Sequence, residues 1–192
     1  MHHGLFWKFH GARAITGAFG QRIIPIIKND MNLFAYHLPL DAHPTVGNAA
    51  MLGKKLGLTE QFPFGDFKGC PTGIKGKLSH PMTAKQLEET LKSILNHNVI
   101  LASPDNSRSI NTLGIITGGA NSDWHLAVKA NLDAYITGEI SEHDWHESQE
   151  NNIHMFAGGH HATEQFGIQE LMKKTQEHFN IECFYIDSKN PA

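Results

Sequence analysis

Side chains that bind metal ions gather in three short stretches of this chain. The opening MHHG carries His2 and His3, HLPLD ends in Asp41, and GGHHATE contains His160 and Glu164. Neutral imidazole is the commonest metal ligand in proteins, and imidazole and carboxylate together suit several divalent ions. A carboxylate can bridge two ions through its two oxygens, which an imidazole nitrogen cannot do. The three stretches therefore predict a metal site with Glu164 as the shared ligand.

The spacing of these residues sets conditions for joint binding. If a helix has begun by His160, then Glu164 four residues later lies on the same face, and both can hold one ion. His2 and His3 leave an extended segment in opposite directions, so both can face one cluster only if the chain turns at Gly4. Local turns are therefore part of the prediction.

Each stretch taken alone has a simpler explanation. An imidazole and a carboxylate near a helix end commonly lie on a surface without any metal, and Asp41 suits a turn or a helix cap. His2 and His3 alone would suggest a start-site accident or the stub of a tag, although a tag is normally a longer uniform run. Only the combination of stretches favours metal binding.

Three further residues are candidates for moving protons at such a site. They are His37, His161 and Glu139. His37 precedes Asp41 by four residues and is also a candidate for orienting that ligand. Glu139 is equally well explained as a carboxylate near a helix N-terminus.

Composition narrows the class of protein. The 192 residues are 40% hydrophobic, enough to bury a core, and 14 histidines raise the expectation of a metal site. The net charge of −3 argues against nucleic-acid binding, which relies on lysine and arginine. Cys70 and Cys183 fit neither a disulfide framework nor a zinc ribbon, and no apolar run is long enough to cross a membrane. We expect a cytoplasmic protein.

The pattern of apolar segments predicts an α/β fold. Strand-like VILAS, LGIIT, AYIT, HMFA and CFYI alternate with helical segments that begin near Ser122, Ser141 and Ala162. In such a sheet, functional groups gather beyond the carboxyl ends of the strands. In the first half of the chain we expect a helix over 17–30, with Pro25 near its first turn or bending it, and a buried strand in MNLFAYHLPLD that ends just before Asp41. A helix over 46–56 and a loop-rich connection over 57–81 should follow. The next element should be a helix over 83–95, opened by a capping box of Thr83 and Gln86.

The chain contains a short internal repeat, because ITGGANSDWH and ITGEISEHDWH have similar sequences. We interpret it as two strand-turn-helix units that each need a glycine turn and a serine cap. The alternative is that Thr117, Gly118 and Gly119 present backbone N–H groups to a phosphate, but no Walker lysine accompanies them.

Together, HHGLFWK, YHLPLDAHPTVGNAAML, ITGEISE, GGHHATEQFG and FYIDSKNPA closely resemble the YbgI-like branch of the GTP cyclohydrolase 1 type 2 homologues, also called the Nif-three-like family. The resemblance runs from residue 1 to 192. It implies two linked α/β lobes with a site for two divalent metal ions between them, and a ring-shaped homohexamer. The implied lobes are 1–60 plus 150–192, with 61–149 inserted between them.

The resemblance also assigns the ligands. It implies that Glu164 bridges the two ions, with His3 and Asp41 on one ion and His2 and His160 on the other. Zinc, manganese, iron and nickel all suit such a mixed set of ligands.

The resemblance includes one departure. Family members carry a further segment before their His-His motif, with the first strands and helices of the N-terminal lobe. Without those elements, we expect unpaired strand edges and exposed core in that lobe.

Three functions follow from these patterns. The first is a metal-dependent hydrolase of unknown substrate, for which the resemblance implies action on C–N bonds and a nucleotide-like small molecule as a candidate partner. The second is a non-catalytic metal-binding scaffold or regulator that acts through the ring. The third is that the shortened chain is a remnant without activity.

Overall fold

The computed structural model describes residues 1–191. Its internal contacts divide the chain into two units, Met1–His37 and Leu38–Ala192. Within the described residues, no helix is long and apolar enough to cross a bilayer. The division into lobes 1–60 plus 150–192 and 61–149 stays a prediction.

The larger unit is built on a six-stranded sheet, and this confirms the predicted α/β class. The strand order is β1-β2-β4-β5-β6-β3. The central β4, β5 and β6 are parallel, whereas β1, β2 and β3 pair antiparallel at the two sides. The strands are β1 (Leu58–Phe64), β2 (Gly73–Thr83), β3 (Ile100–Ala102), β4 (Ser109–Ile115), β5 (Ala134–Thr137) and β6 (His154–Ala157).

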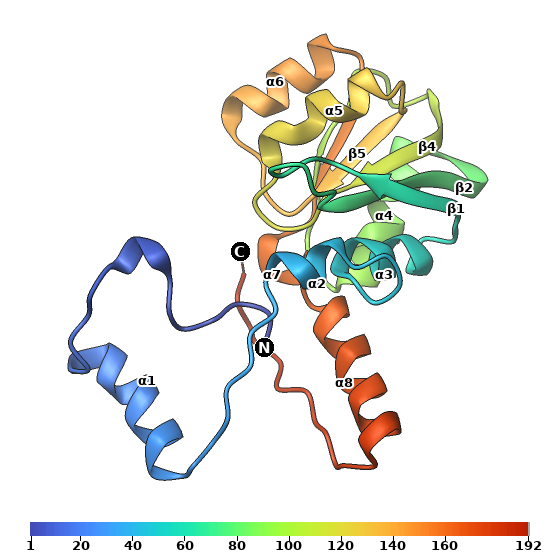
Figure 1. Cartoon of the computed structure of the whole chain (residues 1–192). Helices are drawn as coiled ribbons and strands as arrows, with labels where there is room; N and C mark the ends of the chain where they lie inside the picture. Colours follow the sequence, from blue (N-terminus) through green and yellow to red (C-terminus); the bar gives the residue numbers. More distant parts are fainter. Residues whose placement is uncertain (192) are drawn as a thin grey trace. The chain divides into compact units, whose positions relative to one another are not determined.

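Helices cover both faces of this sheet (Figure 1). Side chains alternate across a strand, so Ile136 and Tyr135 of β5 join two different core clusters. The cluster that contains Ile136 includes Leu52 and Leu91 from α3 and α4, while Trp124 from α5 joins the other cluster. The helices of this unit are α2 (Leu38–Ala42), α3 (Asn48–Lys55), α4 (Ala84–Leu95), α5 (Trp124–Lys129), α6 (Glu142–Glu150), α7 (His160–Thr163) and α8 (Phe166–Phe179), with a 3-10 turn at Asn121–Asp123.

The capping box that opens α4 is present as predicted. The backbone N–H of Gln86 donates to Thr83 Oγ1 at 3.3 Å, and the N–H of Thr83 donates to Gln86 Oε1 at 2.9 Å. By contrast, the prediction of a loop-rich connection over 57–81 is wrong, because this segment forms β1 and most of β2. Pro63 suggested a loop, but it lies on the edge strand β1, where proline can be tolerated.

Two predicted strands are also wrong. Residues 31–37 and 183–186 form no strand, and Asp41 lies in α2 instead of just after a strand end. An apolar run becomes a strand only when a neighbouring segment accepts and donates its backbone hydrogen bonds. Here the backbone around Phe34 and Tyr36 forms too few bonds for a strand: the Met1 amine donates to the Phe34 carbonyl, the Met1 carbonyl accepts from the Tyr36 N–H, and the Tyr36 carbonyl accepts from the His2 ring.

The smaller unit contains a 3-10 turn (Lys8–His10) and α1 (Gly17–Lys28). Pro25 lies in the last turn of α1, so the first of our two alternatives, a position near the first turn, is wrong. Phe6 and Phe9 are 71% and 78% exposed, and Phe34 is also exposed. Exposed aromatic surface of this kind favours association with another apolar surface.

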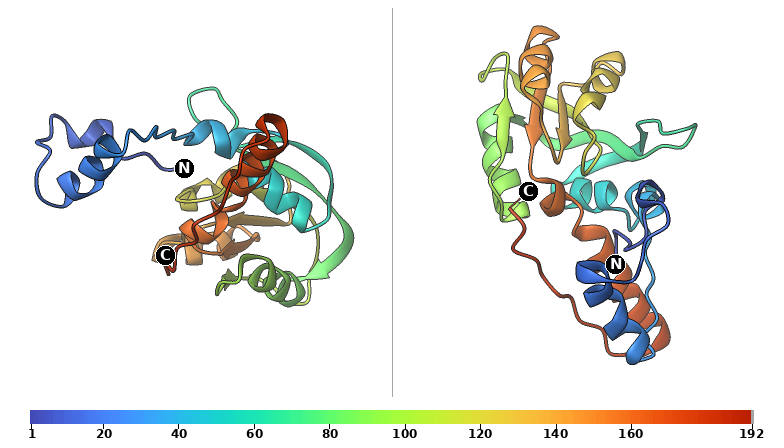
Figure 2. Two further views of the ribbon diagram at one scale, coloured as in Figure 1. Left: turned by 90° about the horizontal axis from the view of Figure 1, so that it is seen from below. Right: turned by 90° about the vertical axis from the view of Figure 1, so that its left-hand side faces the viewer.

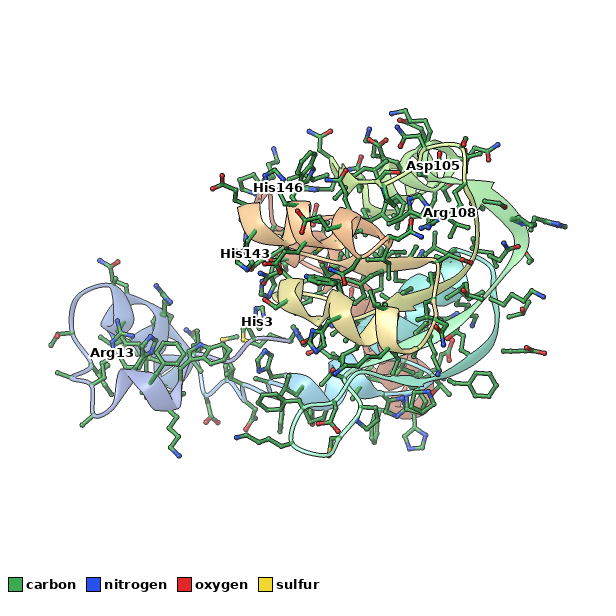
Figure 3. All side chains as sticks on the ribbon, turned by 90° about the horizontal axis from the view of Figure 1, so that it is seen from above. His3, Arg13, Asp105, Arg108, His143 and His146 are labelled. Atoms are coloured by element: carbon green, nitrogen blue, oxygen red, sulfur yellow. The ribbon has the colours of Figure 1, made fainter. Side chains whose placement is uncertain are left out.

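A histidine at the start of β6 is buried in neutral form. His154 is fully buried; its Nδ1–H donates to Ser103 Oγ at 3.0 Å, and its Nε2 accepts from Arg108 Nε at 3.1 Å. Arg108 lies on the same loop as Asp105 (Figure 3). Burial, followed by the Arg108 guanidinium, lowers the pKa of His154 from 6.5 to about 4.

This arrangement predicts an acid-sensitive fold. Because the unfolded chain takes up the His154 proton first, the stabilising contribution is complete above pH 6.5 and is lost as the pH falls to about 4. We expect this loss to reach about 3 kcal/mol. Urea unfolding across this range, compared with the non-titrating His154→Gln variant, measures it. An equal pH slope in the variant would contradict the prediction.

Candidate metal centre

The carboxyl ends of the three parallel strands meet at one edge of the sheet. Gly118 follows β4, Gly138 follows β5 and Gly159 follows β6. Their turns are joined by backbone hydrogen bonds, from Gly138 N–H to the Gly118 carbonyl at 3.0 Å and from Gly159 N–H to the Gly138 carbonyl at 2.9 Å. This edge is where the α/β pattern predicted functional groups.

Two of these glycines are required by close packing. Gly118 has a φ of +70°, and a Cβ on it would overlap Glu164 Oε1. A Cβ on Gly138 would lie 2.7 Å from His160 Cα. The N–H of Gly118 donates to Thr163 Oγ1 at 3.1 Å, so it is used inside the protein and not offered to a phosphate. The glycines of the two similar segments therefore serve turn packing, as we predicted. The predicted serine cap is present at Ser141 but not at Ser122, which lies inside the 3-10 turn Asn121–Asp123.

His160 lies between two carboxylates. Its Nε2 is 3.1 Å from Glu164 Oε2, which confirms that the two side chains share one face of the chain around α7. Its Nδ1 is 2.5 Å from Glu139 Oε1. The hydrogen bond with Glu164 is the largest cause that raises the pKa of His160 from 6.5 to about 9; burial opposes the rise, and Glu139 adds to it. The space between these carboxylates therefore favours positive charge.

Asp41 is held beside this group by a buried network. It accepts from Asn48 Nδ2 at 2.7 Å and from Thr117 Oγ1 at 3.3 Å. One of its carboxylate oxygens lies within 4.8 Å of one from Glu164. Asn48 is fully buried, and its own Oδ1 accepts from the Gly167 N–H at the start of α8 at 2.7 Å. The orientation of Asp41 is thus fixed by α3, α8 and the turn after β4.

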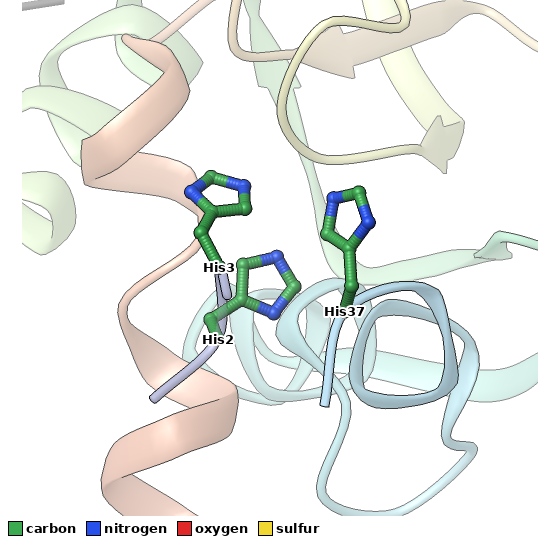
Figure 4. A group of neighbouring side chains, drawn as sticks. All are labelled: His2, His3 and His37. Atoms are coloured by element: carbon green, nitrogen blue, oxygen red, sulfur yellow. The ribbon is translucent and has the colours of Figure 1, made fainter. Parts of the chain in front are cut away.

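The smaller unit carries a cluster of three imidazoles (Figure 4). Ring nitrogens of His2, His3 and His37 lie within 4.8 Å of one another. The Nδ1–H of His2 donates to the Tyr36 carbonyl at 3.1 Å, which leaves Nε2 as the nitrogen suited to bind a metal. We expected His37 to orient Asp41. The centroid of its ring lies 5.2 Å from the ring centroid of His2 and 5.1 Å from that of His3.

The donor atoms of each unit fit divalent metal ions. Asp41, His160 and Glu164 combine carboxylate oxygens with an imidazole nitrogen, the mixture that transition ions accept. The imidazole cluster supplies borderline-soft nitrogen ligands, whose metal bonds are about 2 Å long. Each set has orienting hydrogen bonds behind it, which is usual for metal ligands.

Several supporting residues were not recognised in the sequence. Asn48, Thr117 and Thr163 hold the backbone or the ligands in place; Thr163 lies within GGHHATE but was not singled out there, and the other two lie outside the metal-binding stretches. The repeated Ile-Thr-Gly triplets were a signal for Thr117, since each places a threonine just before its glycine. Nothing in the sequence pointed to Asn48, because its hydrogen bonds to Asp41 and Gly167 form only when the chain has folded.

Comparison with known proteins gives consistent matches. The family model Duf34/NIF3 (NGG1p interacting factor 3) matches residues 1–191. A protein of Vibrio cholerae named GTP cyclohydrolase 1 type 2 homolog is 40% identical over all of this chain and 76% of its own length. A Haemophilus influenzae protein of the same name is 38% identical, with the same shares of the two chains covered.

Solved structures agree with this fold. A structural-genomics structure titled protein ybgI, unknown function, has a TM-score of 0.91 and 34% identity, covering 100% of this chain and 75% of that one. A Thermus thermophilus protein, TTHA1606, has a TM-score of 0.85 and 25% identity, covering 100% and 74%.

Proposed function

This chain belongs to the Duf34/NIF3 family, and we propose that it is a metal-dependent hydrolase with two divalent metal ions per subunit. The observation that carries this proposal is the position of His160 between Glu139 and Glu164, with Asp41 nearby. Such a group of acidic side chains around one imidazole favours positive charge, which a divalent ion would supply.

The proposed ligands are those that the family resemblance implies. Glu164 would be shared by the two ions, His3 and Asp41 would hold one of them, and His2 and His160 would hold the other. When bound, two such ions lower the pKa of a shared water molecule and stabilise negative charge on the group under attack. Asn48 and Thr117 keep Asp41 aimed, and Glu139 orients His160 through Nδ1.

Proton transfer is assigned to groups beside the proposed ligands. Glu139 is 53% exposed as a side chain and can exchange protons with solvent while it contacts His160. His161 follows His160 on α7 and is a second candidate, and His37 lies with the imidazoles of the smaller unit. Each could carry a proton to a leaving group.

The substrate and the assembly are further parts of the proposal. The curated relatives are named as homologues of a GTP cyclohydrolase, so nucleotides and other molecules with ring C–N bonds are the first substrates to test. We propose a ring-shaped homohexamer, as the family resemblance implies.

Metal content and turnover test the proposal together. The purified protein is loaded separately with zinc, manganese, iron and nickel, bound metal per chain is measured by mass spectrometry, and hydrolysis of nucleotides, phosphoesters and cyclic amides is screened. We expect two ions per chain, and loss of both metal and turnover in Glu164→Gln. Glu177→Gln, an exposed change on α8 with the same charge difference, serves as the control.

Two results would change the conclusion. Full metal content and turnover in Glu164→Gln would refute the proposed centre. Two bound ions without turnover on any substrate class would replace the hydrolase with the non-catalytic scaffold.

A further inference from the structure

The larger unit contains a cavity next to the candidate centre. Its volume is about 750 Å³, within the range of small-molecule sites. Its walls come from the end of α4, the turn that follows, α7 with the residues just after it, and the C-terminal segment 187–191. Four separate parts of the chain therefore line one space.

The C-terminal segment forms one wall of this cavity. After α8 it returns to the body of the larger unit (Figure 2). The ring of His97 makes a hydrogen bond from Nε2 to the Pro191 carbonyl at 3.0 Å. The same ring packs on Gly159, where an added Cβ would lie 2.8 Å from it. Gly159 directly precedes His160, so the cavity wall and the candidate centre share one short stretch of backbone.

The lining of the cavity is polar and carries both signs of charge. Lys92 and Lys189 contribute ammonium groups, Asp187 a carboxylate and His161 an imidazole. Lys92 already forms a salt bridge, with its Nζ 2.6 Å from Glu88 Oε1. Among the residues that the structure describes, Lys189 forms no salt bridge, so its charge is available to a ligand.

We propose that this cavity binds a small polar molecule through an anionic group, phosphate or carboxylate, held by Lys189 and His161. Side-chain amides such as that of Gln165 line the rest of the space and suit a hydrogen-bonding ligand. His161 is the neighbour of His160 in the chain, so a ligand held here would lie beside the backbone that carries the candidate centre. The assignment of the cavity as the substrate pocket rests on the proposed function, whereas anion binding does not.

Titration calorimetry with inorganic phosphate and with succinate tests the site, on the full chain with and without bound metal. We expect Lys189→Gln to weaken binding about tenfold, since a charge-assisted hydrogen bond is lost. Asp187→Asn should tighten anion binding, because it removes a negative charge from the lining of the cavity. Lys129→Gln, an exposed change on α5 with the same charge difference, should leave binding unchanged.

Lys189→Gln and Asp187→Asn keep the test decisive, because they are expected to change the anion affinity in opposite directions. All changed residues are exposed, so the fold should survive, and metal content is measured in parallel. Loss of anion binding in Lys189→Gln at unchanged metal content supports the site, even if no hydrolysis is ever found. Equal affinities in Lys189→Gln, Asp187→Asn and Lys129→Gln, or no binding of either anion at millimolar concentration, would overturn it. Preference for phosphate over succinate would identify the anionic group.

Discussion

Replacing Gly118 with alanine is expected to cost about 2 kcal/mol or more of unfolding free energy. Two effects add at this position. A φ of +70° is unfavourable for any residue with a Cβ, and the new Cβ would overlap the Glu164 carboxylate, which is only 8% exposed. Glu164 must then leave His160 and Asp41, so the variant should also fail to retain metal. Urea unfolding and metal analysis measure the two results.

Gly69→Ala provides the matched control. Gly69 has a φ of +82°, but nothing lies within 4 Å of the position of its Cβ. This variant therefore carries the backbone strain without the overlap and should lose only about 1 kcal/mol. If Gly118→Ala and Gly69→Ala lose the same stability and the same metal, the close packing around Glu164 has no energetic role.

Replacing Asn48 with leucine is expected to destabilise the larger unit by about 3 kcal/mol. The change removes the amide that donates to Asp41 and the oxygen that accepts from the Gly167 N–H. Asn48 is fully buried, so water cannot replace these bonds without opening the packing of α3 against α8. Thermal and urea unfolding measure the loss.

Asn48→Asp separates the two bonds. It keeps the acceptor for Gly167 but places a second carboxylate against Asp41, where the original contact was 2.7 Å. Repulsion between the carboxylates should destabilise this variant at neutral pH, and its stability relative to the wild type should recover as the pH falls, because one carboxylate takes up a proton. Asn151→Leu, which removes one exposed hydrogen bond, is the control. Wild-type stability in both Asn48 variants would refute the role of the network.

The parts of the fold that depend on local chemistry were predictable. The capping box at Thr83, the helices over 46–56 and 83–95, and the alternation of strands and helices after residue 98 all follow from side-chain hydrogen bonds and apolar periodicity within a few residues. The hairpin of β1 and β2 was missed because glycine and proline in 57–81 resemble loop residues, although an edge strand tolerates them.

The predicted strands at 31–37 and 183–186 failed for a related reason. The residue types around Phe34 and Phe184 favour a strand, but they do not show whether another segment lies alongside to pair with it. Asp41 was expected beyond a strand end for the same reason, and it lies in α2 instead.

The sequence by itself determined which side chains could bind a metal and which residues could cap a helix or make a turn, because these properties belong to residue types and short spacings. Only the tertiary structure decided that Glu139 meets His160 across 21 residues, and that Asn48, which donates to Asp41, meets Gly167 across 119 residues. It also decided that Gly118 has no room for a Cβ. These contacts depend on which segments pack together, and packing is set by the whole core and not by any local pattern.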